Sequence, residues 1–525
     1  MPRKPKNYGY NAPFVIKDNP VIAGHFPDPG ISLLSPAFRS PKTIPATFGN
    51  GTSGPTEDLV LDQFLDELDG RNDCMTYDKT TLRSEEGRNI PYVVLSASSK
   101  PTRSLPKDPR KLRLWIQGAT HGDEPASDQS ILALLGKLDT NPGQTLSMLQ
   151  NLDILIVPRY NPDGVAYFQR RFATNFDPAR DHIRLRSAQT RSIKSLFNSF
   201  APHVAVDMHE FSAKARYAER YVRILDGQFA VGKNLNIHSD IRALSEELFV
   251  KSIATALEDA GLRWAPYSTG LRDAAADGLL NFSEAGSEAC ITRNAWGLTQ
   301  TVAILCETRG IGIADQHFAR RTFTGLKMLE AIISTTVQHA DEIHLKLEGA
   351  SQSFITSKED IIITDIPEMV DCTLPFFDLR TNNLVDVPTT LKSTTKLRPQ
   401  FSRKRPRAYL IPKAWSELTS RLEANGIEVQ TLDHAFSGEV EILKVTSVEI
   451  DTEYDEGCIR ANITTRPIMK HVRLPLGSFS VNTVQKRAGL AFMALEPESV
   501  DSFATMNIIP LVTGDEYPIF RQLWN

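Results

Sequence analysis

The feature that most constrains this chain is a set of four apolar, strand-like runs that each end in a short polar cluster. The clusters are His121-Gly-Asp-Glu124 after LRLWIQGAT, Asn161-Pro-Asp-Gly164 after LDILIVPRY, Asp207-Met-His209 after PHVAV, and Glu307-Thr-Arg-Gly310 after TVAILC. In open α/β sheets, sites gather in the crevice outside the carboxyl ends of the strands. We therefore expect these four clusters, which are far apart in the sequence, to meet in one site.

Amphipathic helical segments separate these runs, and their order predicts the fold class. The expected helices lie at 59–71, 125–138, 239–260 and 313–345, and the first expected strands lie at 90–98 and 111–119. Pro125 opens the second helix in the favoured first-turn position. Strands that alternate with helices indicate a largely parallel or mixed sheet that is covered on both faces. We therefore expect an α/β fold.

Composition changes twice along the chain and divides it into three predicted parts. Residues 1–56 hold roughly a third of the prolines and show no sustained periodicity, which is typical of an extended or partly disordered arm. Residues 57–347 carry the α/β pattern and all four clusters. Residues 348–525 are mostly β-like, with one strand-helix-strand interruption at 407–432, and are predicted to form a β-rich accessory domain.

Charge and hydrophobicity favour an ordinary globular protein. The net charge of -4 and the pI near 6.3 give no electrostatic reason to expect nucleic acid or an anionic membrane as a partner. No run of 18 apolar residues occurs, so no transmembrane helix is expected. The first residues, MPRKPKNYGYNAPFV, lack the apolar region of a secretory signal. We expect a cytoplasmic location for the chain as written, and an exported one if its N-terminus is processed.

His121, Glu124 and His209 have the chemistry of a hydrolytic zinc site. Such sites favour imidazole nitrogens and a carboxylate, with three protein ligands and one open position. His121 and Glu124 lie at a strand-to-helix junction and can face one ion, and His209 comes from another strand. Taken singly, the plainer interpretations are a solvated loop for the HxxE pair and a satisfied core histidine for His209. The five cysteines show no CxxC spacing, so a thiolate zinc site is not expected, although a Cys290–Cys306 disulfide stays open.

Glu307 is the candidate general base. A carboxylate after the apolar run TVAILC would be costly to bury without a partner, so we expect it to face a site. The alternative is an ion pair between Glu307 and Arg309. Glu210 is the rival base, but strand alternation turns it away from the face that His209 uses.

The segment after Asn161 connects these residues. It reads Arg170-Arg171-Phe-Ala-Thr-Asn-Phe-Asp177-Pro-Ala-Arg180. With the HxxE pair before it and His209 and Glu307 after it, this order resembles the zinc metallocarboxypeptidase family, of the carboxypeptidase A and B type, over roughly residues 75–345. The resemblance implies an α/β/α sandwich with a mixed central sheet, and one zinc ion per chain. It also implies that the zinc ligands are His121, Glu124 and His209.

The same resemblance implies roles for further polar residues. Asp177 accepts a hydrogen bond from His121, a support that fixes the tautomer of a ligand, although capping a helix or turn is its alternative role. Arg180 binds the terminal carboxylate of the substrate, a task suited to the guanidinium fork. Either Arg170 or Arg171 stabilises the developing oxyanion, with Arg171 slightly preferred.

Departures from the family pattern concern substrate binding. Ala179 stands where the family usually has Asn, so one hydrogen bond to the substrate carboxylate is absent or comes from elsewhere. Tyr267 is the available match to a mobile tyrosine of the family, but it lies farther upstream of Glu307 than expected. Arg293 offers a further anion contact, and its alternative role is in a structural loop.

These observations predict a zinc-dependent hydrolase that removes C-terminal residues from peptides. One alternative is a zinc deacylase or amidase that acts on N-acyl amino acids, and another is a non-catalytic, metal-binding scaffold. The complete ligand set together with Glu307 argues against the scaffold, because decay usually removes a ligand or the base. The expected partner is therefore a peptide or an acyl amino acid, while the oligomeric state is not specified by the sequence.

Overall fold

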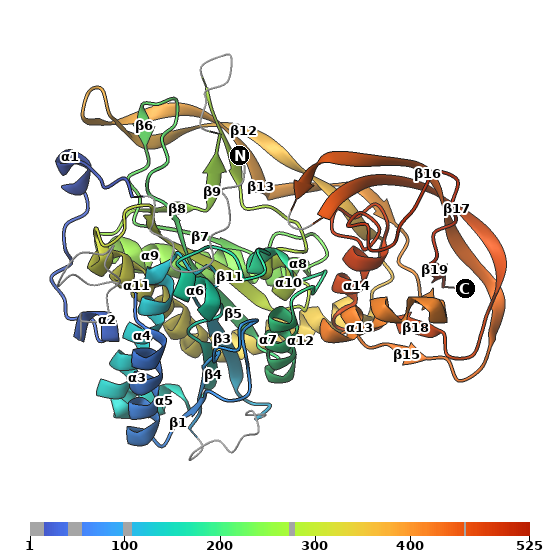
Figure 1. The fold of residues 1–525 in the computed structure, drawn as a ribbon, viewed down its shortest axis with the longest axis horizontal. Coiled ribbons are helices and arrows are strands. Elements are labelled where there is room, and N and C mark those ends of the chain that lie inside the picture. The colour runs from blue at the N-terminus through green and yellow to red at the C-terminus, as the bar shows by residue number, and fades with distance from the viewer. Residues whose placement is uncertain (1–14, 40–54, 98–107, 272–278, 456–457, 525) are drawn as a thin grey trace.

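A computed structural model describes residues 15–39, 55–97, 108–271, 279–455 and 458–524. Its centre is an eight-stranded sheet with the order β1-β2-β4-β3-β5-β11-β7-β8 (Figure 1). These strands are β1 (Met75–Asp78), β2 (Tyr92–Leu95), β3 (Leu112–Gln117), β4 (Leu152–Val157), β5 (Val204–Ser212), β7 (Gly227–Val231), β8 (Trp264–Pro266) and β11 (Val302–Ile311). The central strands β4, β3, β5 and β11 are parallel, whereas β1, β2 and β7 join by antiparallel pairing. The predicted α/β fold with a mixed sheet is confirmed.

Helices cover both faces of this sheet. They are α3 (Asp58–Arg71), α4 (Pro125–Thr140), α5 (Pro142–Met148), α6 (Pro162–Tyr167), α7 (Ala188–Phe200), α8 (Ser239–Leu244), α9 (Lys251–Asp259), α10 (Thr292–Gly297), α11 (Phe318–Gln338) and α12 (Ala340–Thr356). A π-helical stretch, Ser245–Val250, joins α8 to α9, so the helix predicted at 239–260 is continuous. The segment 313–345 instead contains two helices that meet at His339, whose φ of -114° leaves the helical region although the apolar pattern continues.

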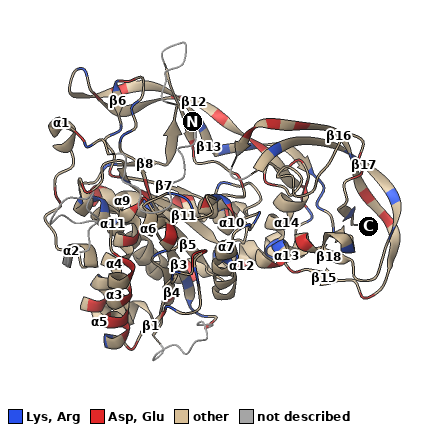
Figure 2. Ribbon diagram, viewed as in Figure 1, with Lys and Arg blue, Asp and Glu red and all other residues tan. Residues whose placement is uncertain are grey.

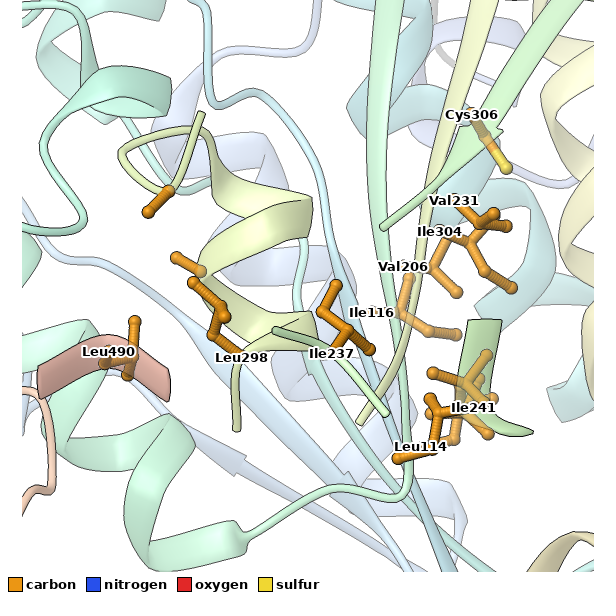
Figure 3. Packing of buried hydrophobic residues seen from close by; sticks show 14 of the residues in the cluster. Leu114, Ile116, Val206, Val231, Ile237, Ile241, Leu298, Ile304, Cys306 and Leu490 are labelled. Carbon is orange, nitrogen blue, oxygen red and sulfur yellow. The ribbon is translucent and has the colours of Figure 1, made fainter. Parts of the chain in front are cut away.

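Alternation along the central strands builds two separate cores. Val206 of β5 and Ile304 of β11 belong to the core that includes α4 and α11 (Figure 3). The neighbouring position Ala205 belongs to the other core, where Phe197 of α7 stacks on Trp296 of α10 with ring centroids 5.2 Å apart. Successive side chains of a strand point to opposite faces, so the same strands form both layers of the sandwich.

The C-terminal part is β-rich, as predicted, but it is interwoven with the α/β part. The predicted boundary between residues 347 and 348 falls inside α12. A long hairpin of β12 (Ile361–Asp378) and β13 (Asn383–Arg403) then forms a five-stranded sheet with β6 (Tyr221–Val222), β9 (Ser268–Gly270) and β10 (Leu280–Glu284). Because three strands of this sheet come from before residue 348, the hairpin is an integral wall of the α/β part.

A second sheet completes the C-terminal part. Its order is β15-β18-β14-β19-β16-β17, with β14 (Ala408–Ile411), β15 (Gln430–Thr431), β16 (Phe436–Asp455), β17 (Cys458–Leu474), β18 (Phe479–Asn482) and β19 (Phe520–Gln522). The helices here are α13 (Ser416–Ala424) and the fully buried α14 (Ala488–Leu495). Leu490 of α14 packs in the same core as Leu298, which follows α10 (Figure 3). This helix therefore fastens the second sheet to the α/β part.

The described part of the N-terminal segment packs on the α/β body. It contains the short helices α1 (Pro20–Ala23) and α2 (Pro36–Arg39). Asp18 is buried and pairs with Arg309 of β11 through contacts of 2.6 and 2.9 Å. Of the arm predicted at 1–56, residues 1–14 and 40–54 lie outside the described residues.

Charged residues of both signs are interspersed along the ribbon (Figure 2). Within the described ranges, no helix has both the length and the apolar character that a bilayer crossing requires. All five cysteines are free thiols, so the Cys290–Cys306 disulfide that the sequence left open does not form.

Candidate metal centre and substrate cavity

The pairing of β5 with β11 brings the first functional side chains together. These strands are parallel, and their register sets Glu307 opposite His209. Alternation places Asp207, His209 and Glu307 on the face that carries α7 and α10. Both strands continue beyond these residues, to Ser212 and Ile311. The prediction that the two clusters follow the ends of their strands was wrong, because sheet pairing continues after the apolar run stops.

The loop between β3 and α4 supplies the other two candidate ligands. Ala119 adopts a left-handed conformation with φ of 48°, which turns the chain out of β3. Gly122 lies against α6, where a Cβ atom would fall 1.9 Å from the carbonyl carbon of Gly164. Only glycine allows this approach, and the approach fixes the loop that carries His121 and Glu124.

The polar cluster after β4 braces this loop and does not line the cavity. Asn161 accepts a hydrogen bond from the Gly164 amide at 2.9 Å and so caps α6. The buried Asp163 accepts hydrogen bonds of 2.7 Å from Ser84 and from Arg88. Of the four clusters expected in one site, the structure thus brings three to the centre and uses the fourth as support.

His121, Glu124 and His209 form a buried cluster with the geometry of a metal site. Nδ1 of His121 lies 2.7 Å from Glu124 Oε1 and 3.0 Å from Nδ1 of His209, which in turn lies 2.9 Å from Glu124 Oε2. Ligand atoms around a tetrahedral zinc ion lie roughly 3.3 Å apart, given metal–ligand bonds of about 2.0–2.1 Å. The spacing is slightly tighter than this, and the donor set of two imidazoles and one carboxylate is that of catalytic zinc sites. The residues therefore fit a zinc ion.

Each ligand histidine has a carboxylate on its other ring nitrogen. Nε2 of His121 lies 3.1 Å from Asp177 Oδ1, and Nε2 of His209 lies 2.9 Å from Asp207 Oδ2. Asp177 also accepts a hydrogen bond from the Ala179 amide at 2.9 Å, so its predicted support and capping roles coexist. Such carboxylates fix the tautomer and the ring orientation of a ligand.

Asp207 is the supporting residue to which the sequence analysis assigned no role. Its Oδ1 accepts hydrogen bonds from Gln117 at 3.0 Å and from Thr120 at 2.9 Å, which hold it against His209. The available signal was its position two residues before His209, because such spacing on a strand puts both side chains on one face.

The neighbouring charges separate the two candidate bases. Glu210 faces the opposite layer, where it pairs with Arg321 of α11 at 2.7 Å. Arg309 pairs with Asp18, so the ion pair considered for Glu307 does not form. Burial raises the pKa of Glu307 to about 7, against the charge of the neighbouring His209. Glu307 is thus the carboxylate that faces the centre.

A cavity of about 1050 Å³ opens from this cluster. Its lining includes the three candidate ligands, the predicted catalytic residues Arg170 and Glu307, and the predicted substrate-binding residues Arg180, Tyr267 and Arg293. The C-terminal part also contributes to this wall, through residues such as Leu397 of β13, Arg460 of β17 and Asp501, which were not predicted from the sequence. No local motif marks those residues, because only the sheet contacts bring them to the cavity.

The two adjacent arginines occupy different environments. Nη1 of Arg170 lies 3.1 Å from Nδ1 of His121 and 3.4 Å from Glu124 Oε1, and Nη2 lies 2.9 Å from Asp177 Oδ2. Burial raises the pKa of Asp177, but the charges of Arg170 and His121 outweigh burial and hold it well below its usual range. Arg171 does not line the cavity and donates to the carbonyl oxygen of Asn175 at 3.5 Å. The structure thus brings Arg170, and not the slightly preferred Arg171, to the centre.

Comparisons with known proteins agree with this geometry. A family model described as zinc carboxypeptidase matches residues 61–215. Proteins called carboxypeptidase 2 from Trichophyton tonsurans and Trichophyton rubrum are 48% identical to this chain over 98% of its length and 95% of theirs. The chain belongs to the zinc carboxypeptidase family. A metallo-carboxypeptidase structure from Burkholderia cenocepacia is similar over 54% of this chain and 70% of that one, with 15% identity and a TM-score of 0.40.

In this zinc carboxypeptidase, Tyr267 follows β8 and lies in the cavity near Glu307. The charge of Glu307, followed by burial, raises the pKa of Tyr267, so its hydroxyl stays protonated and able to donate a hydrogen bond. Arg180 ends the 3-10 turn Pro178–Arg180, and its Nη1 donates to the Ala179 carbonyl oxygen at 3.1 Å. The cavity thus holds donors on several sides of the metal centre.

Proposed function

We propose that this chain is a zinc metallocarboxypeptidase that releases single residues from the C-termini of peptides. The observation that carries the proposal is that the cluster of His121, Glu124 and His209 opens into a cavity that also contains Glu307 and Arg180. These residues provide an ion site, a base and a receptor for a terminal carboxylate. Among the described residues this is the one cluster suited to a metal, which supports one zinc ion per chain.

His121, Glu124 and His209 would hold the zinc ion, which when bound would polarise a carbonyl oxygen and lower the pKa of a water molecule. Asp177 and Asp207 accept the Nε2 protons of His121 and His209, which leaves each Nδ1 atom as the lone-pair donor. The two carboxylates thus orient the imidazole rings of His121 and His209, and both rings are fixed before any substrate binds.

Glu307 accepts the proton of the attacking water and passes it to the leaving amine. The strand register sets it beside His209, so the water and the base share one face of the sheet. A general base works best when its pKa is close to the operating pH, and burial raises the pKa of Glu307 to about 7. This placement supports acid–base chemistry near neutral pH.

Arg170 stabilises the negative charge that develops on the scissile carbonyl oxygen. Its guanidinium group touches His121 and Glu124 and is held from behind by Asp177. About 40% of the side chain remains exposed, so it can still reach a substrate. A donor that is in place beforehand stabilises the transition state without reorganisation.

Arg180 binds the free C-terminal carboxylate of the peptide. A bidentate contact between guanidinium and carboxylate adds both energy and geometric selection. Because Arg180 lines the same cavity as the metal cluster, binding a terminal carboxylate there would bring the end of the peptide, and not its middle, to the cluster. This supports an exopeptidase.

A pool of peptides tests the proposal. Incubated with zinc-loaded protein, the peptides should lose single C-terminal residues, which mass spectrometry would detect as a ladder. Cleavage inside the peptides, or action restricted to small N-acyl amino acids, would contradict the carboxypeptidase assignment while leaving the metal site intact.

The role of Arg180 has its own test. Arg180→Ala should reduce kcat/KM on free peptides by the equivalent of about 2–4 kcal/mol, because a charge-assisted pair in a partly desolvated cavity is lost. Amidation of the peptide C-terminus should produce a similar loss in the wild type, and the two losses should not add, since both remove one contact. Equal cleavage of amidated and free peptides by the wild type would exclude this role.

A further inference from the structure

Two arginines of the cavity wall have no acidic partner. Arg293 is only 4% exposed; its Nη2 donates to the carbonyl oxygen of Gly286 at 2.5 Å, and its Nε has no hydrogen-bond partner. Arg180 donates to the carbonyl oxygen of Ala179. Neither guanidinium forms an ion pair with a carboxylate of the described residues, although burial lowers the pKa of Arg180 and the charge of Asp177 outweighs burial and raises it.

Three acidic residues of the same wall already have donors. Glu284 accepts hydrogen bonds from the amides of Thr394 and Thr395 at 2.7 and 3.0 Å. Asp365 accepts one from the Ser287 hydroxyl at 2.9 Å, and Asp501 accepts one from the Cys290 amide at 2.9 Å. These three acids are held by their own protein neighbours, whereas the two arginines donate only to backbone carbonyl oxygens.

Two cations that share a cavity are unfavourable without anions, most of all the buried Arg293 beside the partly buried Arg180. Burial, followed by the charge of Arg180, lowers the pKa of Arg293 to about 10. A charge in a low-dielectric site is costly unless it is paired, so a ligand with negative groups would relieve both residues. One guanidinium group can bind one carboxylate through two hydrogen bonds. If Arg180 binds the terminal carboxylate, the guanidinium group of Arg293 is available for a second carboxylate.

The guanidinium groups of Arg180 and Arg293 also come from different structural elements. Arg180 ends the turn Pro178–Arg180, and Arg293 lies on α10 and is held there by the loop at Gly286. A C-terminal Asp or Glu carries two carboxylates on one residue, one terminal and one on its side chain. Such a residue can therefore offer one carboxylate to each of two arginines that line one cavity.

We propose that Arg293 binds the side-chain carboxylate of the substrate's last residue, and that the enzyme therefore selects peptides ending in Asp or Glu. The inference rests on the proposed function, because it takes the terminal carboxylate to be bound by Arg180. A preference for acidic residues follows, with Gln and Asn as the matched uncharged analogues.

Kinetics on matched peptides test this selection. Peptides that differ only in their last residue should be cleaved with kcat/KM for Glu roughly tenfold to a hundredfold above that for Gln, the range for a charge-assisted contact. Arg293→Gln should remove this ratio by slowing Glu release, and Arg293→Lys should restore part of it. Arg242→Gln is the control, because Arg242 also donates to a backbone carbonyl oxygen, that of Ile237, but lies outside the cavity lining.

Two results would overturn the proposal. One is equal release of Glu and Gln by the wild type. The other is an equal decrease of kcat/KM for all substrates in Arg293→Gln, which would indicate that Arg293 binds the terminal carboxylate instead. Zinc content measured for every variant shows whether the site is still assembled.

Binding of the free amino acids gives a readout that does not need catalysis. L-glutamate should raise the melting temperature of the zinc-loaded wild type more than L-glutamine does, because a ligand that binds the folded state stabilises it. Arg293→Gln should abolish the difference and Arg242→Gln should keep it. If no peptide were cleaved, the proposed function would fail, yet this measurement would still decide whether Arg293 recognises a second carboxylate. Equal shifts with both amino acids in the wild type would refute that recognition.

Discussion

Asp207 Oδ2 lies 2.9 Å from Nε2 of His209, while Nδ1 of the same ring faces Glu124. This pair decides which nitrogen can bind a metal, because the ring donates its Nε2 proton to the carboxylate and keeps the lone pair on Nδ1. Gln117 and Thr120 hold Asp207 from the other side. The orientation of a candidate metal ligand is therefore set by a carboxylate outside the cluster of His121, Glu124 and His209.

Replacing Asp207 should weaken zinc binding. Asp207→Ala removes the acceptor for Nε2 of His209, and we expect the zinc affinity to fall about 10–100-fold. Competition with a chelator would measure the change. Asp153→Ala is a suitable control, since Asp153 is a buried aspartate that lies on β4 and contacts Lys111. Unchanged zinc affinity in Asp207→Ala would contradict the supporting role.

Removing a ligand should remove the metal. His121→Ala and His209→Ala each leave two protein ligands, fewer than the three that catalytic zinc sites use. Elemental analysis of purified protein should find zinc near one per chain in the wild type and little in either variant. His344→Ala, which affects a histidine paired with Glu348 on α12, should retain zinc. Full occupancy in both ligand variants would show that the ion binds elsewhere.

The base assignment predicts different outcomes for two glutamates. Glu307→Gln should keep zinc and fold but lower kcat by roughly a hundredfold or more, because glutamine cannot accept the proton. Glu210→Gln weakens the pair with Arg321 and should reduce stability more than turnover. Normal turnover in Glu307→Gln together with inactive, folded Glu210→Gln would move the base to Glu210.

The pH profile should carry the signature of Glu307. A base acts only when ionised, so kcat/KM should fall as the pH drops below its pKa, by about tenfold per pH unit at the limit. Burial raises the pKa of Glu307 to about 7, and a bound cation lowers it again. We therefore expect the acidic limb at or below pH 7, and its absence in Glu307→Gln. A limb that persists unchanged in this variant would belong to another group.

The pair between Asp18 and Arg309 should anchor the N-terminal segment. Asp18→Ala leaves the buried Arg309 guanidinium without its partner, and breaking such a pair costs about 3–5 kcal/mol of unfolding free energy. Denaturant unfolding would measure the loss. The Lys17→Ala control, which affects a half-exposed ion pair with Asp315, should change stability by less than about 1 kcal/mol.

The direction of the pKa shift of Asp18 determines how the stabilisation by the Asp18–Arg309 pair depends on pH. Burial raises the pKa of Asp18, but the neighbouring His317 and the hydrogen bonds from Arg309 outweigh it and lower the pKa from 3.8 to about 2. The folded state therefore favours the ionised carboxylate, so the stabilisation is complete above the unfolded pKa and is lost as the pH falls toward 2. The stability difference between wild type and Asp18→Ala should accordingly shrink only in acid. A difference that stays constant down to pH 2 would show that packing, and not the charge pair, provides the anchoring.

The local pattern of the sequence determined the central sheet and pointed to the candidate metal ligands. Apolar runs identified the central strands, and the two-residue period of a strand put Glu210 on the opposite face from His209, as the pair with Arg321 shows. The HxxE spacing pointed to His121 and Glu124, because residues that are close together along a short loop also lie close together in space. These features depend on residues close together in the chain.

Only the tertiary structure decided which distant residues meet. The structure brings Arg170 to the candidate ligands, where it contacts His121, whereas Arg171 donates to the carbonyl oxygen of Asn175. It paired Arg309 with Asp18 across nearly the whole α/β part, and it brought Asp501 into the cavity wall. The local sequence carries little information about such contacts, because each contact depends on how whole sheets and helices pack. Many pairings between similar residues are chemically equivalent, and only the packing determines which of them forms.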